Sequence, residues 1–130
     1  MDDREFITAF EACTLPPSEF HHRDHVRLAW IYLREDDLLP ALTRFATSLK
    51  RYATSLGAAS KYHETITWAF LFLIHERMQH TPGKDFATFA QWNEDLFAWK
   101  PSVLERYYTP GLLGSELART TFVMPDVRTS

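Results

Sequence analysis

The sequence predicts an all-α protein, a compact single-domain bundle of six or seven helices around a buried central helix. Apolar residues recur at three- and four-residue steps along most of the chain, and no strand-like alternation extends beyond a few residues. Residues 66–74 are apolar at every position except Thr67, and a helix that is apolar on all sides is normally surrounded by other helices. A chain of 130 residues suits one domain, residues 1–130, with one modest core.

Prolines, glycines and capping residues mark where each predicted helix begins or ends. Asp2 or Asp3 can cap the first helix, Leu15-Pro16-Pro17 follows its end, and Gly57 follows the third. Pro101 and Pro110 are expected in the first turn of two late helices. The expected helices span about 3–13, 19 or 21 to 34, 37–56, 62–79, 85–92, 101–108 and 111–119, with a further turn from Asn93 to Phe97.

The second helix has a charged side opposite its histidines. With His25 set at zero and ~100° per residue, Arg23, Arg27 and Arg34 fall at ~160°, ~200° and ~180°. Arginine favours water, so this stripe marks the solvent side. The side centred on His25 should therefore face the core, with His21 and His22 beside it.

His63 is expected in the first turn of the central helix, on a face shared with apolar residues. Unpaired N–H groups and the helix dipole disfavour a positive imidazole there, so the ring should stay neutral. A neutral imidazole suits a metal ligand or a general base.

Together these positions predict a mononuclear metal site held by His22, His25 and His63. His22 and His25 are i, i+3 neighbours, and a third histidine from another helix leaves an open coordination position, as in catalytic metal sites. His21 is an alternative to His22. Asp24 and Glu64 are expected as general bases or as partners of the ligands. Zinc or iron would be the metal, and hydrolase or lyase chemistry would suit the open position.

Other interpretations of these histidines remain open, because no standard metal motif fits. His63-Glu64 is followed by Thr67 where H-E-x-x-H requires a second histidine. Each histidine can instead be a hydrogen-bonded core residue, or a histidine and a glutamate can form a metal-free acid–base site. Whether the protein is an enzyme is left undecided.

The aromatic content of 15% is high enough to line a pocket for a small molecule as well as to fill a core. Tyr62, Thr67, Arg106 and Tyr107 are the expected ligand contacts, with Arg106 able to bind an anion. The alternative is a surface helix over 101–108. A non-catalytic small-molecule-binding module, with the histidines as hydrogen-bonding groups, is therefore the second hypothesis.

Net charge, cysteine content and the N-terminal segment restrict the partners and the cellular location to be expected. A net charge of −3 implies no basic face for nucleic acid and no polybasic membrane patch. One cysteine, Cys13, excludes an intrachain disulfide and is expected to be a buried, inert thiol. The acidic start MDDREF lacks the apolar run of a signal peptide. These features predict a cytoplasmic protein without a nucleic-acid or membrane partner. The expected partner is the small molecule of the aromatic-lined pocket, and a homodimer is a further expectation.

Four segments carry a resemblance to known proteins: FHHRDHVRLAW, YHETITWAF, KPSVLERYY and FVMPD. They resemble a group of short, uncharacterised bacterial all-helical proteins. The resemblance implies one helical domain and gives weight to a shared set of residues, namely His22, Asp24, His25, Tyr62, His63 and Thr67. The chain is more loosely similar to DinB-type bundle proteins, which hold a metal with three histidines. Neither resemblance implies a particular reaction.

Overall fold

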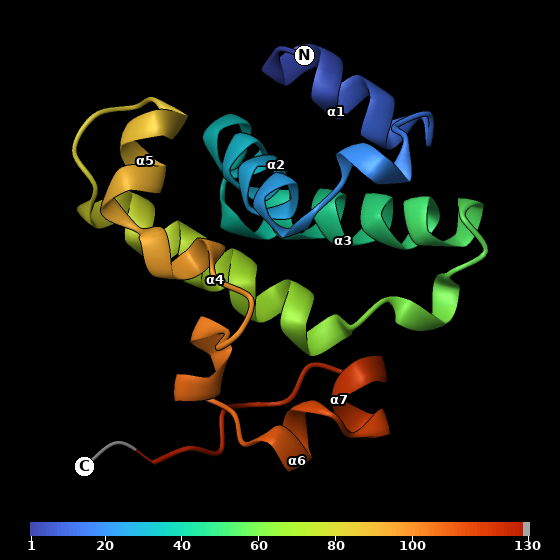
Figure 1. Ribbon diagram of the computed structural model, residues 1–130, viewed down its shortest axis with the longest axis vertical. Coiled ribbons are helices and arrows are strands. Elements are labelled where there is room, and N and C mark those ends of the chain that lie inside the picture. The colour runs from blue at the N-terminus through green and yellow to red at the C-terminus, as the bar shows by residue number, and fades with distance from the viewer. Residues whose placement is uncertain (129–130) are drawn as a thin grey trace. The chain divides into compact units, whose positions relative to one another are not determined.

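The computed structural model, which describes residues 1–128, is all-α, as predicted (Figure 1). The longest helices are α2 (His22–Glu35), α3 (Leu38–Ser55) and α4 (Glu64–His80). The shorter α-helices are α1 (Asp3–Glu11), α5 (Phe86–Trp92), α6 (Pro110–Leu113) and α7 (Glu116–Thr120). Four 3₁₀ helices connect them, namely η1 (Pro17–Glu19), η2 (Ala59–Lys61), η3 (Glu94–Phe97) and η4 (Val103–Arg106). Over residues 1–128, no helix is both long enough and apolar enough to cross a membrane.

Within the predicted domain, contacts divide the chain into two compact units, Met1–Tyr62 and His63–Ser130. In the first unit, α1 and α2 each pack on α3 and on one another (Figure 1). Aromatic side chains of this unit meet around the buried Phe10, whose ring lies 5.4 Å from the rings of both Phe20 and Tyr52 and 6.3 Å from that of Phe45. All three ring pairs are tilted, and their centroid distances lie in the range of favourable aromatic contacts. We call Phe10, Phe20, Phe45 and Tyr52 the aromatic cluster of the first unit.

In the second unit, α4 packs against α7 and η4. The prediction for residues 66–74 is confirmed, because every position in this stretch is buried or half-buried. Phe70, Leu71 and Ile74 are among its buried side chains. The half-buried Trp68 stacks on Phe122, with ring centroids 5.2 Å apart. The apolar side chains of α4 are therefore covered by α7, by η4 and by Phe122.

The C-terminal segment 121–128 is held by hydrogen bonds to the rest of this unit. The fully buried Thr65 hydroxyl donates to the Thr121 carbonyl (2.8 Å) and accepts from the Val123 amide (3.1 Å). The Tyr108 hydroxyl donates to the Val123 carbonyl (2.8 Å). Asp126 accepts hydrogen bonds from the amide and hydroxyl groups of Thr109. These hydrogen bonds hold the segment to the rest of the unit, although Met124 is 74% exposed.

Several predicted boundaries were wrong, for local reasons. The first helix ends at Glu11 rather than Cys13, because Cys13 adopts a left-handed backbone with φ 60°. The helix expected over 101–108 is only the 3₁₀ turn η4, which Ser102 caps through the Leu104 amide. The helix expected over 111–119 is two short helices. Ser115 starts the second by accepting a hydrogen bond from Ala118.

Candidate functional site

His21, His22, Asp24 and His25 lie together at the start of α2, in the first unit. His21 is the N-cap residue, and the Asp24 carboxylate accepts a hydrogen bond from its backbone amide (2.9 Å). Asp24 therefore caps the helix, which is a structural role that the sequence interpretation did not assign to it. His22 is the first helical residue and is half-buried.

His25 lies flat against the aromatic cluster, as the position of the arginine stripe predicts. Its ring stacks on Phe20 with centroids 3.9 Å apart and planes inclined by 21°. Burial, with a smaller contribution from the charge of His22, lowers the pKa of His25 to about 4, whereas Asp24 acts in the opposite direction. The imidazole is therefore neutral at pH 7, which is the form that binds metals.

The arginine stripe faces solvent only in part. Arg23 and Arg34 are exposed. Arg27 instead lies over the Phe6 ring at 4.8 Å and forms an ion pair of 2.8 Å with Asp3. α1 covers this end of the stripe, so the assignment of Arg27 to a purely solvent-facing position was wrong.

His63 is the N-cap of α4, in the second unit, and both of its ring nitrogens contact the backbone. Nδ1 accepts a hydrogen bond from the Ile66 amide (3.1 Å), and Nε2 lies 2.8 Å from the Leu113 carbonyl oxygen. An amide N–H only donates and a carbonyl only accepts, so Nδ1 carries the lone pair and Nε2 the hydrogen. A metal ion at His63 would have to replace one of these two bonds.

The neighbours of His63 also have local partners. Glu64 accepts a hydrogen bond from the Trp68 indole N–H (3.0 Å). The buried hydroxyl of Thr67 donates to the His63 carbonyl (2.7 Å). Tyr62 belongs to the first unit, where the Lys50 ammonium lies 5.1 Å from its ring centroid. The Thr67 hydroxyl therefore stabilises the first turn of α4, and the ligand contacts expected at Tyr62 and Thr67 stay predictions.

The predicted metal ligands belong to different units, His22 and His25 to the first and His63 to the second. Among residues 1–128, neither unit brings three His, Cys, Asp or Glu side chains into one metal-binding group. The three-histidine site and its zinc or iron ion therefore remain predictions.

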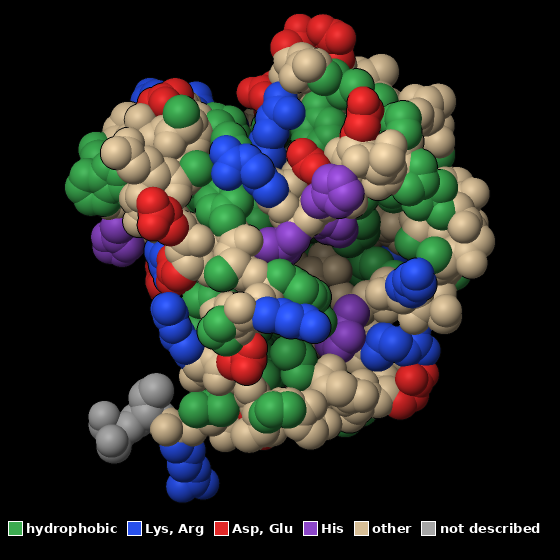
Figure 2. Space-filling model, in the orientation of Figure 1, with side chains coloured by type: hydrophobic (Ala, Val, Ile, Leu, Met, Phe, Trp, Pro, Cys, Tyr) green, Lys and Arg blue, Asp and Glu red, His purple; other side chains and the backbone are tan. Residues whose placement is uncertain are grey.

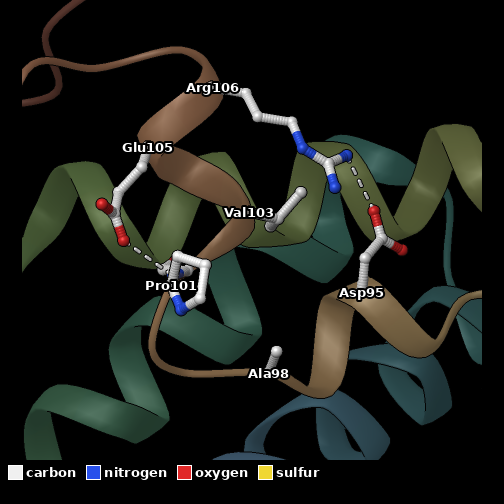
Figure 3. Close-up of a pocket in the computed structure, with 7 residues that line it drawn as sticks. Asp95, Ala98, Pro101, Val103, Glu105 and Arg106 are labelled. Atoms are coloured by element: carbon white, nitrogen blue, oxygen red, sulfur yellow. Dashed lines mark hydrogen bonds and ion pairs between the residues drawn. The ribbon is translucent and has the colours of Figure 1, made fainter.

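A hollow of about 300 Å³ in the second unit is the other candidate site (Figure 3). Its lining includes Arg106, one of the predicted ligand contacts, and has no aromatic side chain, unlike the pocket that the composition suggested. It is lined by Asp95, Ala98, Pro101, Ser102, Val103, Glu105 and Arg106. Many of the aromatic rings instead lie in the interior of each unit, while Trp92 and Trp99 are exposed.

Arg106 lines this hollow from η4 and is held there by Asp95. Its Nη1 atom lies 2.9 Å from Asp95 Oδ2. Arg77 binds both oxygens of the same carboxylate at 2.8 Å, which, with a smaller contribution from Arg106, lowers the pKa of Asp95 to about 2. The hydrogen bond to Asp95 in turn raises the pKa of Arg77. Tyr107, also predicted to contact ligand, lies outside the lining and is half-buried.

The sequence interpretation missed Asp95, Arg77 and Glu105. Arg77 and Asp95 are eighteen residues apart on different elements, so no helical spacing links them. Glu105 had one local signal, since the S-x-x-E pattern Ser102 to Glu105 is that of a capping box.

The exposed surface carries both signs of charge. The face shown in Figure 2 mixes Lys and Arg with Asp and Glu side chains, consistent with a net charge of −3. Comparison with known protein families, curated proteins and solved structures finds no match to this chain.

Proposed function

We propose that the protein is a non-catalytic small-molecule-binding module whose ligand occupies the hollow at η4. The observation that carries this proposal is the lining, which combines apolar Ala98, Pro101 and Val103 with charged Glu105 and Arg106. Small-molecule sites combine mostly apolar walls with a few placed polar groups, and their volumes begin at about 300 Å³. The hollow is at this lower limit, so the ligand is small.

Titration followed by ¹H–¹⁵N NMR spectra tests this function directly. The ligands are a panel of neutral, anionic, cationic and zwitterionic compounds of up to about ten non-hydrogen atoms, a size chosen for a pocket of this volume. We expect saturable shifts that cluster in residues 95–106, and weaker binding in Arg106→Gln. The control is Glu94→Gln, which changes an exposed residue outside the lining. Shifts confined to other segments, or none with any compound, would contradict the proposal.

Metal binding by the histidines is the second candidate function, and the state of His25 favours it. The ring is neutral, and no hydrogen bond joins its nitrogens to a residue within 1–128. A pKa of about 4 also makes His25 a poor general base at pH 7, because catalytic bases have pKa values near the working pH. Metal ligation by His22 and His25 therefore has better support than general-base catalysis by His25.

Elemental analysis of protein purified without a nickel column tests the metal candidate. His22→Ala and His25→Ala should each lose bound zinc or iron, whereas His80→Ala, at an exposed position, should keep it. His63→Ala asks whether the predicted third ligand takes part. A protein that holds far less than one equivalent, and whose Tm is unchanged by added zinc or iron, would rule the candidate out.

A further inference from the structure

Two side chains that line the hollow at η4, Glu105 and Arg106, have hydrogen-bonding atoms without a partner among residues 1–128. Glu105 accepts one hydrogen bond, from the Ser102 amide to Oε2 (2.8 Å), and Oε1 accepts none from this part of the chain. Arg106 uses Nη1 for Asp95, while its Nε and Nη2 donors have no partner there. Figure 3 shows the Glu105 carboxylate on one side of Val103 and the Arg106 guanidinium on the other.

The surrounding network restrains the Arg106 side. Asp95 is fixed by the two hydrogen bonds from Arg77, which also donates to the Asn93 side-chain oxygen (3.1 Å). Asn93 is buried and donates to the Phe89 carbonyl (2.9 Å). Arg106 itself is 61% exposed and hence accessible to a ligand. A pre-positioned guanidinium loses less freedom when it binds a carboxylate.

The charges of this region balance. Arg77 and Arg106 both pair with Asp95, and Glu105 adds a second carboxylate to the lining, so this region holds two positive and two negative side chains. A purely anionic ligand would pair with Arg106 and leave Glu105 unpaired, and a purely cationic ligand would pair with Glu105 and leave Arg106 without a ligand contact. A ligand that carries both charges can match both walls.

We propose that the hollow binds a small zwitterion in which a short apolar chain separates an amine from a carboxylate, as in ω-amino acids. The ammonium group would contact Glu105 Oε1, and the carboxylate would accept from Nε and Nη2 of Arg106. The methylene chain would lie on Ala98, Pro101 and Val103. This inference rests on the proposed binding function and specifies its ligand class.

Four matched compounds test the ligand class by NMR titration. The probe is 6-aminohexanoate, hexanoate lacks its amine, and hexylamine lacks its carboxylate. Norleucine is an isomer of the probe with both charges at one end. We expect the probe to bind with a Kd on the order of millimolar. It should bind about threefold to fivefold tighter than the other three compounds, because each of them lacks one exposed ion pair that the probe can form, and such a pair contributes about this much affinity.

Two variants, each of which removes one charge, measure the contributions of Glu105 and Arg106 separately. Glu105→Gln keeps an oxygen for the Ser102 amide, and it should weaken the probe to the affinity of hexanoate without affecting hexanoate itself. Arg106→Gln should weaken the probe to the affinity of hexylamine. Glu94→Gln and Arg128→Gln, at exposed positions outside the lining, should leave all four affinities unchanged.

The outcomes distinguish this inference from the proposed function. Equal affinities for 6-aminohexanoate, hexanoate and hexylamine, with shifts in residues 95–106, would overturn the zwitterion and leave the binding function standing. Tighter binding of norleucine would overturn the requirement for separated charges. No shift in residues 95–106 with any of the four compounds or the wider panel would overturn both proposals.

Discussion

The Nε2 atom of His63 donates a hydrogen bond of 2.8 Å to the carbonyl oxygen of Leu113. The same ring caps α4 through Nδ1 and the Ile66 amide. One imidazole thus forms hydrogen bonds with a carbonyl group at the end of α6 and with an amide group in the first turn of α4. His63 was expected inside the first turn of this helix, but it lies one position before the first helical residue and caps the helix instead.

Replacing His63 by alanine should destabilise the protein by about 1–3 kcal/mol, because it removes an N-cap and leaves the Leu113 carbonyl without this donor. His63→Asn should lose less stability, since asparagine is a good N-cap residue. The free energy of unfolding in urea at pH 7 measures both. Equal stability of wild type and His63→Ala would contradict the capping role.

Removing the hydroxyl of Thr65 should loosen the C-terminal segment. Thr65→Val leaves the Val123 amide without its acceptor, at an expected cost of about 1–3 kcal/mol. The matched control is Thr54→Val, which removes an exposed hydroxyl bonded to the Lys50 carbonyl and should matter by less than about 0.5 kcal/mol. Urea unfolding measures the stabilities, and amide exchange at Val123 should accelerate only in Thr65→Val.

Stability should decline in acid because of His25. Its pKa is lowered from 6.5 to about 4 in the folded protein. Between these values the unfolded chain binds more protons than the folded one, so stability falls as the pH drops from about 6.5 to about 4. The loss over this window should reach about 2–4 kcal/mol. His25→Gln should show a flatter profile of unfolding free energy against pH, whereas the exposed His80→Gln should follow the wild type.

Truncating Phe70 should be among the more damaging single changes in α4. Phe70 is buried, and Phe→Ala in a core costs about 3–5 kcal/mol. Leu39→Ala is the control, because Leu39 is 69% exposed and its removal leaves no cavity. Denaturation midpoints of the two variants report the difference. Similar midpoints would show that the α4 core tolerates a cavity at this position.

The helices were predictable because their signals are local. Gly57 follows α3, and the run 66–74 forms the middle of α4. The inward orientation of His25 followed from the arginine stripe opposite it, whereas its stack on Phe20 did not. The contacts of Arg27 did not, because they depend on where α1 packs.

The candidate sites were less predictable because their partners are remote in sequence. The bond of His63 spans fifty residues, and no periodicity indicates which carbonyl a capping ring will meet. The hollow at η4 depends on Arg77 and Asp95, which come from different helices. Only Arg106 had been selected from the sequence, on the basis of its charge.

The left-handed backbone of Cys13 has a practical consequence for labelling. Cys13 follows the end of α1, and its amide bonds the Phe10 carbonyl while that of Thr14 bonds the Ala9 carbonyl. Glycine is the usual residue at such a helix end and adopts φ near 60° without strain. Cys13→Gly should therefore remove the only thiol of the chain without loss of stability. The resulting cysteine-free protein would accept a single fluorophore or spin label at a chosen position, for example on each unit in turn.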